Sequence, residues 1–263
     1  MWTEFALIGL VAGYMAGFLG IGGGFIVVPA LTFLFLKDPM TAPWAIHMAV
    51  ATSLSIMLVT SLSSVLAHHR KGAIHWSLVR SMVVGLTAGA ILGAAIADFL
   101  PGEILIRIFG LLAILAGLQL ILGRHRDGEK PLPGQPGASA TGGFIGLISA
   151  LIGIGGGAIT VPWLLWHGVH PQRAVATSAA CGYPIAIAGS LSFVVLGLGS
   201  GLPDATLGYV HLRAFAGIAL LGALAAPLGA ATVHRLPPGA VTRVFGVFLA
   251  LVGTNMLLNP HIA

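Results

Sequence analysis

Apolar runs of about twenty residues follow one another along almost the whole chain, and short polar stretches separate them. A helix of about 20 residues spans the hydrocarbon core of a bilayer, which is ~30 Å thick. Only 7% of the 263 residues are charged and 57% are hydrophobic, whereas roughly a quarter of the residues of a soluble domain are charged. So few charges cannot cover a surface in water. We therefore expect an all-α polytopic membrane protein in a lipid bilayer.

The apolar runs form two sets with the same internal order. Each set begins with a long tract that a glycine cluster interrupts, and three unbroken runs follow, which gives about eight hydrophobic segments. The runs are 4–36, 45–67, 77–97 and 104–122, and then 139–166, 174–196, 209–233 and 240–258. A polar stretch rich in proline and glycine lies between the sets, as is typical of an exposed linker. We predict a first transmembrane repeat at 1–123, a cytoplasmic linker at 124–138 and a second repeat at 139–263.

The repeat is also visible in the residues themselves. Gly20-Ile-Gly-Gly-Gly-Phe-Ile-Val-Val-Pro29 aligns with Gly153-Ile-Gly-Gly-Gly-Ala-Ile-Thr-Val-Pro162. Ala49-Val-Ala-Thr-Ser53 returns unchanged as Ala174-Val-Ala-Thr-Ser178. Later in the halves a single offset aligns His75 with His211 and Arg107 with Arg243. Ordered matches of glycines, prolines and polar residues in both halves indicate an internal duplication.

Two arrangements of the halves are open. Each broken tract either crosses the membrane once, which gives parallel repeats, or enters and returns as a hairpin, which gives inverted repeats. The inverted arrangement puts nine Lys and Arg residues inside and three outside, against seven and five in the parallel one. Cytoplasmic loops are rich in Lys and Arg, so the charges favour inverted repeats. Each arm of a broken tract also has about 15 residues, or ~22 Å of helix, which is too short to cross alone.

Runs of glycine break a helix, because each costs about 1 kcal/mol relative to alanine. The helices expected to restart at Phe25 and Ala158 would direct unpaired N–H groups and a positive dipole end at the break, which suits an anion. Packing of helices through small residues is the alternative explanation. We predict that the anion contacts the glycines of both breaks: Gly20, Gly22, Gly23, Gly24, Gly153, Gly155, Gly156 and Gly157.

The duplicated Ala-Thr-Ser elements add hydroxyl groups near the breaks. Thr52, Ser53, Thr177 and Ser178 either donate to the anion or bond back to carbonyl groups of their own helices. We include all four in the predicted substrate site. Cys181, one turn beyond Thr177, and the histidines at the ends of the runs are weaker candidates.

The duplicated Gly-x-Gly-Gly-Gly-x4-Pro signature, the Ala-Thr-Ser elements and the length of the chain resemble the TauE/SafE family of sulfite and organosulfonate exporters, also described as four-helix-duplicated anion permeases. The resemblance extends over essentially the whole chain. It implies that the substrate is a small sulfur-containing anion such as sulfite or an organosulfonate. Many members have asparagine or aspartate-histidine near the Thr-Ser element, where this chain has Ile46-His47-Met48 and Pro171-Gln172-Arg173.

Other functions find less support in the sequence. Metalloprotease, paired-aspartate, nucleophile-elbow and nucleotide-binding motifs are absent, so we expect no enzyme, and any driving force comes from an ion gradient or from the substrate's own gradient. One cysteine provides no metal-binding cluster, and we expect no cofactor, metal or nucleic acid. The N-terminus lacks a basic region, so we expect the first tract to remain in the mature protein, in an inner (plasma) membrane. A passive anion channel, a non-transporting membrane subunit and a homodimer remain open.

Overall fold

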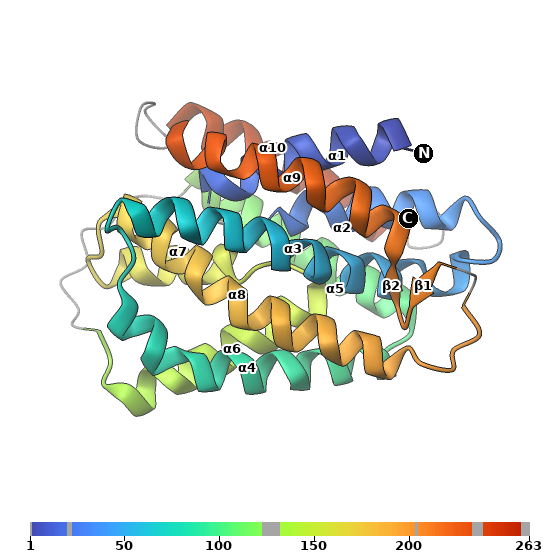
Figure 1. The fold of residues 1–263 in the computed structure, drawn as a ribbon, viewed down its shortest axis with the longest axis horizontal. Coiled ribbons are helices and arrows are strands. Elements are labelled where there is room, and N and C mark those ends of the chain that lie inside the picture. Colours follow the sequence, from blue (N-terminus) through green and yellow to red (C-terminus); the bar gives the residue numbers. More distant parts are fainter. Residues whose placement is uncertain (1, 20–22, 123–131, 203–204, 233–238, 259–263) are drawn as a thin grey trace.

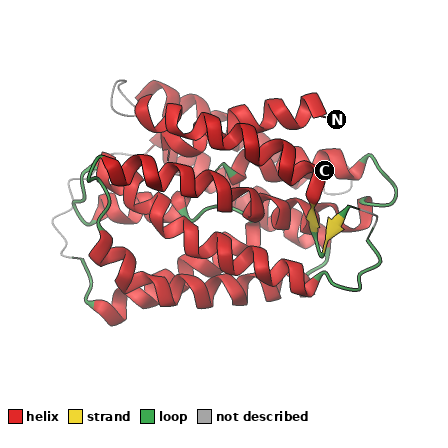
Figure 2. Cartoon of the chain, viewed as in Figure 1, coloured by secondary structure: helices red, strands yellow, loops and turns green. Residues whose placement is uncertain are grey.

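The structure is a computed structural model that describes residues 2–19, 23–122, 132–202, 205–232 and 239–258 (Figures 1 and 2). Within these ranges the chain is almost entirely helical. The first half contains α1 (Trp2–Leu19), α2 (Gly24–Leu36), the short 3₁₀ helix η1 (Ala42–Trp44), α3 (Ala45–Arg70), α4 (Trp76–Phe99) and α5 (Gly102–Leu122). The second half contains α6 (Gln135–Ile152), α7 (Gly157–Trp166), α8 (Pro171–Leu196), β1 (Thr206–Leu207), β2 (Val210–His211), α9 (Leu212–Thr232) and α10 (Gly239–Leu258).

The predicted all-α polytopic fold is confirmed. Each broken tract forms two helices, and each unbroken run forms one. In the described part of the chain, five helices are long and apolar enough to cross a membrane, and shorter apolar helices accompany them. Helix α6 begins at Gln135, so it includes the last residues of the predicted linker.

The two arms of the first broken tract form a hairpin. The rings of Phe5, near the start of α1, and Phe35, near the end of α2, both pack against His211, at centroid distances of 6.4 and 5.1 Å. The start of α1 and the end of α2 therefore lie at the same end of the molecule, which we call the strand end because β1 and β2 lie there (Figure 1).

The second broken tract forms a hairpin from the opposite end, which we call the linker end because α6 begins there. Helix α6 packs alongside α4, with Gly142 against Met82 and Leu86 near the start of both helices. Helix α7 returns toward the start of α8, where Thr177 contacts His75 just before α4 (Figure 1). The two hairpins thus reach the middle of the molecule from opposite ends.

Equivalent helices of the two halves occupy equivalent places. The α3 and α8 helices pack against each other in the centre and run in opposite directions (Figure 1). Helix α1 packs on α9 as α6 packs on α4, and α5 packs on α10. The inverted orientation in a membrane stays a prediction. The positions of the helix ends agree with it: of the described Lys and Arg residues, the strand end carries Lys37, Arg107 and Arg213, and the linker end carries Arg70, Lys71, Arg80, Arg173 and Arg243.

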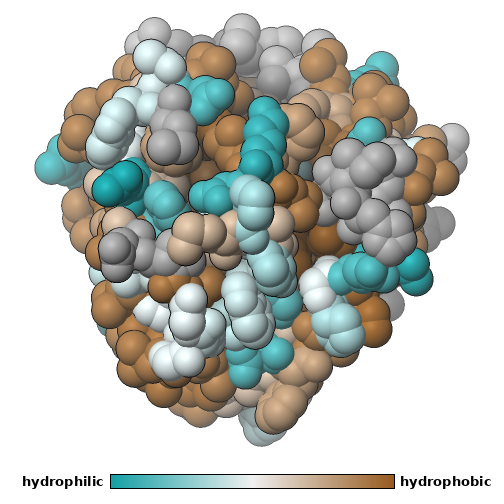
Figure 3. All heavy atoms as spheres, turned by 90° about the vertical axis from the view of Figure 1, so that its right-hand side faces the viewer, coloured by the Kyte–Doolittle hydropathy of each residue, from teal (hydrophilic) through white to brown (hydrophobic). Residues whose placement is uncertain are grey.

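The outer helices expose apolar side chains that water would not favour. They include Val84 on α4, Leu115 on α5, Leu224 on α9 and Leu251 on α10. Figure 3 looks onto the strand end, where hydrophilic side chains gather on the end face while hydrophobic ones occupy much of its rim. This distribution fits a protein whose sides contact lipid and whose ends contact water.

Many glycines outside the breaks allow helices to touch. A Cβ atom at Gly85, Gly89 or Gly93 on α4 would overlap the backbone of α6, and one at Gly13 on α1 would overlap Gly222 on α9. Close packing through small residues is how helices associate in a bilayer. Close helix packing therefore explains the glycines within α1 and α4. It does not explain the two glycine clusters at which the helices end.

Candidate functional site

Backbone conformation explains why the helices end at the glycine clusters. Gly23 and Gly156 precede α2 and α7 with φ angles of 74° and 69°, and Gly153 follows α6 with a φ of 72°. Residues with a Cβ atom rarely adopt this left-handed conformation. The helices α2 and α7 begin at Gly24 and Gly157, one residue earlier in each half than the sequence predicted. The predicted site residues Gly20 and Gly22 lie outside the described residues.

The two breaks meet in the centre of the molecule. A Cβ atom at Gly24, the first residue of α2, would overlap the carbonyl oxygen of Gly153 and lie 2.9 Å from the Cα atom of Ile154. A Cβ atom at Gly153 would lie 2.9 Å from the Cα atom of Val50 on α3. Residues 23–24 and 153–157 are all buried. The structure therefore brings together the two glycine clusters that lie more than a hundred residues apart in the chain.

At the first turn of both helices that begin at the breaks, backbone N–H groups lack a backbone acceptor among the described residues. The carbonyl of Gly23 accepts the N–H groups of Ile26 and Val27 at 3.0 and 3.1 Å, and the carbonyl of Gly156 accepts those of Ile159 and Thr160 at 3.1 and 2.9 Å. Among the described residues, no backbone acceptor bonds the preceding N–H groups, which are those of Gly24, Phe25, Gly157 and Ala158. Free N–H groups and the positive end of a helix dipole favour an anion.

Ser53 connects the first half to the second break. Its hydroxyl, buried on α3, donates a hydrogen bond of 2.8 Å to the carbonyl oxygen of Gly153. This bond holds a carbonyl group that the end of α6 leaves without a helical partner. Ser178 occupies the equivalent position on α8 and is also fully buried.

Thr52 and Thr177 bond to the opposite half of the chain. The Oγ1 atom of Thr52 accepts the backbone N–H of His211 at 3.0 Å, and that of Thr177 accepts the backbone N–H of His75 at 3.0 Å. Neither hydroxyl bonds back to its own helix in the described structure, which the sequence left open. A hydroxyl that accepts one hydrogen bond still has a proton to donate. Contact of these threonines with substrate stays a prediction.

His47 packs in an aromatic cluster at the strand end rather than at the breaks. Its ring contacts those of Trp44 and Tyr209, with centroids 5.8 and 5.7 Å away, and these two rings also contact each other at 5.6 Å. The Nε2 atom of His47 bonds the carbonyl oxygens of Ala97 and Leu100 at 3.2 and 3.1 Å. The phenol of Tyr209 donates a 2.8 Å hydrogen bond to Asp98, and burial raises the pKa of this phenol to about 12. The cluster joins α3 to the end of α4.

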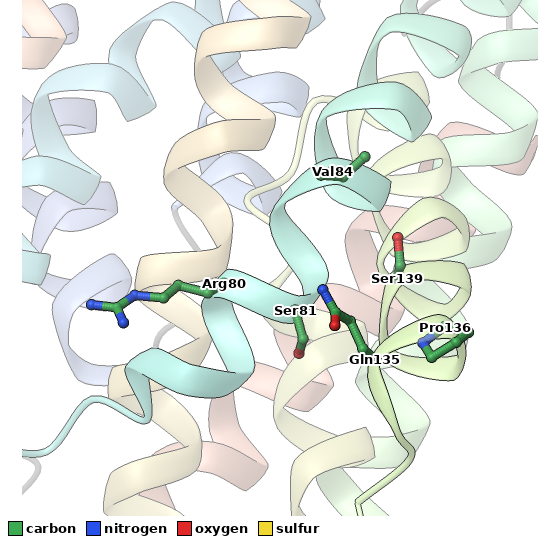
Figure 4. A pocket seen from close by; sticks show the side chains of 6 residues that line it. All are labelled: Arg80, Ser81, Val84, Gln135, Pro136 and Ser139. Atoms are coloured by element: carbon green, nitrogen blue, oxygen red, sulfur yellow. The ribbon is translucent and has the colours of Figure 1, made fainter.

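A surface hollow of about 290 Å³ lies between the starts of α4 and α6 at the linker end, away from the breaks. Its polar residues are Arg80, Ser81, Gln135 and Ser139, and the side chain of Arg80 points away from the others (Figure 4). Within the described ranges, no three His, Cys, Asp or Glu residues are placed to hold a metal ion.

Comparison with known proteins identifies the family. Residues 5–256 match the family model described as sulfite exporter TauE/SafE. The chain belongs to the TauE/SafE family. A probable membrane transporter protein of Haemophilus influenzae is 33% identical over 255 residues, which cover 96% of this chain and 97% of that protein. Proteins with similar descriptions from Methanocaldococcus jannaschii and Bacillus subtilis are 27% and 26% identical, over 96% and 95% of this chain and 94% and 95% of their own lengths.

The family fits the site described above. As a TauE/SafE protein with several apolar helices, the chain is a membrane protein of a transporter family. One polar residue beside the second break, Ser149, is not among the predicted site residues, because its counterpart in the first half is Ala16 and the residue therefore does not recur. The sequence feature that could have indicated Ser149 is a single hydroxyl residue four positions before the Gly153 cluster.

Proposed function

We propose that this TauE/SafE protein moves a small sulfur-containing anion, such as sulfite or an organosulfonate, across the inner membrane, and that the anion binds between the two glycine breaks. The observation that carries the proposal is the meeting of Gly24 with the Gly153 carbonyl, which places the first residue of α2 against the break that precedes α7. Two helix N-termini, whose first N–H groups have no backbone acceptor among the described residues, provide donors for an anion without a buried lysine or arginine. The family description supports sulfur oxyanions as the substrate class.

The hydroxyl groups of the Ala-Thr-Ser elements complete the proposed site. Thr52 and Thr177 are fully buried, and each keeps a proton that its bond to the opposite half does not use. Hydrogen-bond donors of this kind select an oxyanion and offer little to a cation. No catalytic step and no cofactor form part of the proposal.

A carrier fits the described breaks better than an open channel does. All described residues of the two breaks are buried, whereas a continuous aqueous pore requires exposed residues along its path. Flux through a carrier saturates as the substrate concentration rises, and flux through a channel continues to increase. Transport measured over a wide range of sulfite concentrations therefore tests the carrier against the channel.

The central experiment uses purified protein in liposomes. Uptake of sulfite, sulfate, thiosulfate and a short sulfonate is compared with uptake of sodium and potassium, with protein-free liposomes as the control. We expect saturable transport of at least one sulfur anion and of neither cation. Transport of the cations alone would overturn the proposed function, and transport of no tested solute would support a non-transporting subunit.

A further inference from the structure

Ser149 is a buried hydroxyl that no group in the described structure satisfies. It lies on α6, four residues before Gly153, and it is fully buried. Its Oγ atom has no hydrogen-bond partner. Buried hydroxyls on α2, α3 and α7 do form hydrogen bonds. Those of Thr32, Ser55 and Thr160 donate to carbonyl oxygens four residues earlier in the chain. A buried polar group without a partner is costly and requires an explanation.

The position of this hydroxyl supplies the explanation. A Cβ atom built on Gly156 would lie 3.5 Å from the Ser149 Oγ atom, so the hydroxyl lies beside the residue that precedes α7. The N–H groups of Gly157 and Ala158, which no backbone acceptor bonds among the described residues, belong to the same helix start. The hydroxyl of Thr160 is already used, because it donates to the Gly156 carbonyl at 2.9 Å. Ser149 is therefore a side-chain donor still available at this break.

We propose that Ser149 donates a hydrogen bond to one oxygen of the transported anion when that anion is held at the start of α7. The inference rests on the proposed function and adds a specificity-determining residue to it. The equivalent residue of the first half, at the offset that aligns the two breaks, is Ala16, which has no hydroxyl. The second break therefore recognises an oxygen atom through a side chain that the first break lacks. The ligand class is an oxyanion, and its hydroxyl-bound oxygen lies at α7.

The chain offers a matched control. Ser64 on α3 is also a buried serine whose Oγ atom has no hydrogen-bond partner, and it does not border either described glycine break. Alanine removes an unsatisfied hydroxyl in both cases. The thermal stability of both variants should therefore equal or exceed that of the wild type. Only loss of Ser149 should weaken the interaction with the anion.

The test compares wild type, Ser149→Ala and Ser64→Ala in liposomes, with the KM for sulfite as the readout and the Tm in detergent as the control for folding. A hydrogen bond to a charged group accounts for about a tenfold to a hundredfold change in affinity, so KM should rise by that factor in Ser149→Ala and stay unchanged in Ser64→Ala. If Ser149→Ala does not fold, Ser149→Cys retains a side chain of similar size with a weak donor and should show the same increase.

The results separate this inference from the proposed function. An unchanged KM in a folded Ser149 variant, with normal anion transport by the wild type, would overturn the role of Ser149 alone. A wild-type protein that transports none of the sulfur anions would overturn the proposed function, and the role of Ser149 with it.

Discussion

The hydroxyl oxygen of Thr52 lies 3.0 Å from the backbone nitrogen of His211, from which it accepts a hydrogen bond, although 159 residues separate the two in the chain. Thr177 makes the equivalent bond to His75 over 102 residues, also at 3.0 Å. Each half therefore uses the threonine of its Ala-Thr-Ser element to bind the residue that immediately precedes a helix of the other half. These two bonds connect the halves on both sides of the glycine breaks.

Replacing either threonine by valine should destabilise the protein to a similar extent. Thr52→Val and Thr177→Val each leave a partly buried backbone N–H without its acceptor, which costs up to about 1–3 kcal/mol. Thr52→Ser and Thr177→Ser keep the oxygen and serve as controls. Thermal unfolding in detergent measures the effect. A large decrease in Tm for one variant and none for the other would show that the two bonds do not stabilise the protein equally.

Ser53→Ala should impair transport more than Ser55→Ala. Both serines are buried on α3, but Ser53 donates to the Gly153 carbonyl at the second break, whereas Ser55 donates to the Ala51 carbonyl of its own helix. The Ala51 carbonyl keeps its bond within the helix when the Ser55 hydroxyl is removed, and the Gly153 carbonyl loses its partner. Anion uptake into liposomes by the two variants should differ clearly, and equal uptake would show that the second break does not depend on Ser53.

Gly156→Ala should lower the Tm more than Gly72→Ala. Both glycines have positive φ angles, of 69° and 62°, and alanine in this conformation costs about 1–2 kcal/mol at either position. A Cβ atom at Gly156 would also come within 2.9 Å of the Ile185 Cδ1 atom, whereas nothing lies within 4 Å of one at Gly72. Equal losses of Tm would indicate that the second break has room for a side chain.

Acid should weaken the packing around His211. Burial, followed by the positive charge of Arg213, lowers the pKa of His211 below its ordinary value of 6.5. The unfolded chain therefore takes up the proton first as the pH falls, so the contribution of the neutral ring is complete above pH 6.5 and is lost as the pH falls toward the folded-state pKa. His211→Asn keeps an acceptor for the Ala214 N–H and does not titrate.

The measurement compares the Tm of wild type and His211→Asn between about pH 7.5 and about pH 5.5. The wild-type Tm should fall more than that of the variant over this interval. Parallel decreases in the two proteins would attribute the acid sensitivity to other groups.

The sequence was sufficient to predict the helices, the duplication and the positions of the breaks, because hydrophobic run length and glycine clusters are local signals. It placed the starts of α2 and α7 within one residue. It could not show that Thr52 and Thr177 accept N–H groups from the opposite half, since those bonds depend on how distant helices pack. It explained the glycines by the helix break and by contact with an anion, but it could not show that Gly23 and Gly156 have positive φ angles, which favour glycine with or without a ligand.

Ser149 shows a further limit of reasoning from the repeat. Selecting residues that recur in both halves favours Thr52, Ser53 and their counterparts, and it passes over a serine whose counterpart is Ala16. A hydroxyl present at one break and absent at the other gives the two breaks different contacts with a bound anion. Positions where the two breaks differ are therefore the places to look for substrate selectivity.

The inverted arrangement predicts which loops share one side of the membrane. Asp38, between α2 and η1, and Leu207, on β1, both lie at the strand end, and both are exposed. Lys71 and Gln135 lie at the linker end, which carries most of the described Lys and Arg residues and which the positive-inside rule assigns to the cytoplasm. Single cysteines at Asp38 and Leu207 should react with an impermeant maleimide applied to intact cells, and those at Lys71 and Gln135 should react only after lysis. The native Cys181 is fully buried, so the unmodified chain provides the background labelling.

Parallel repeats would instead place Leu207 in the cytoplasm. If the cysteine at Asp38 is labelled in intact cells and the cysteine at Leu207 is protected, the inverted arrangement is excluded.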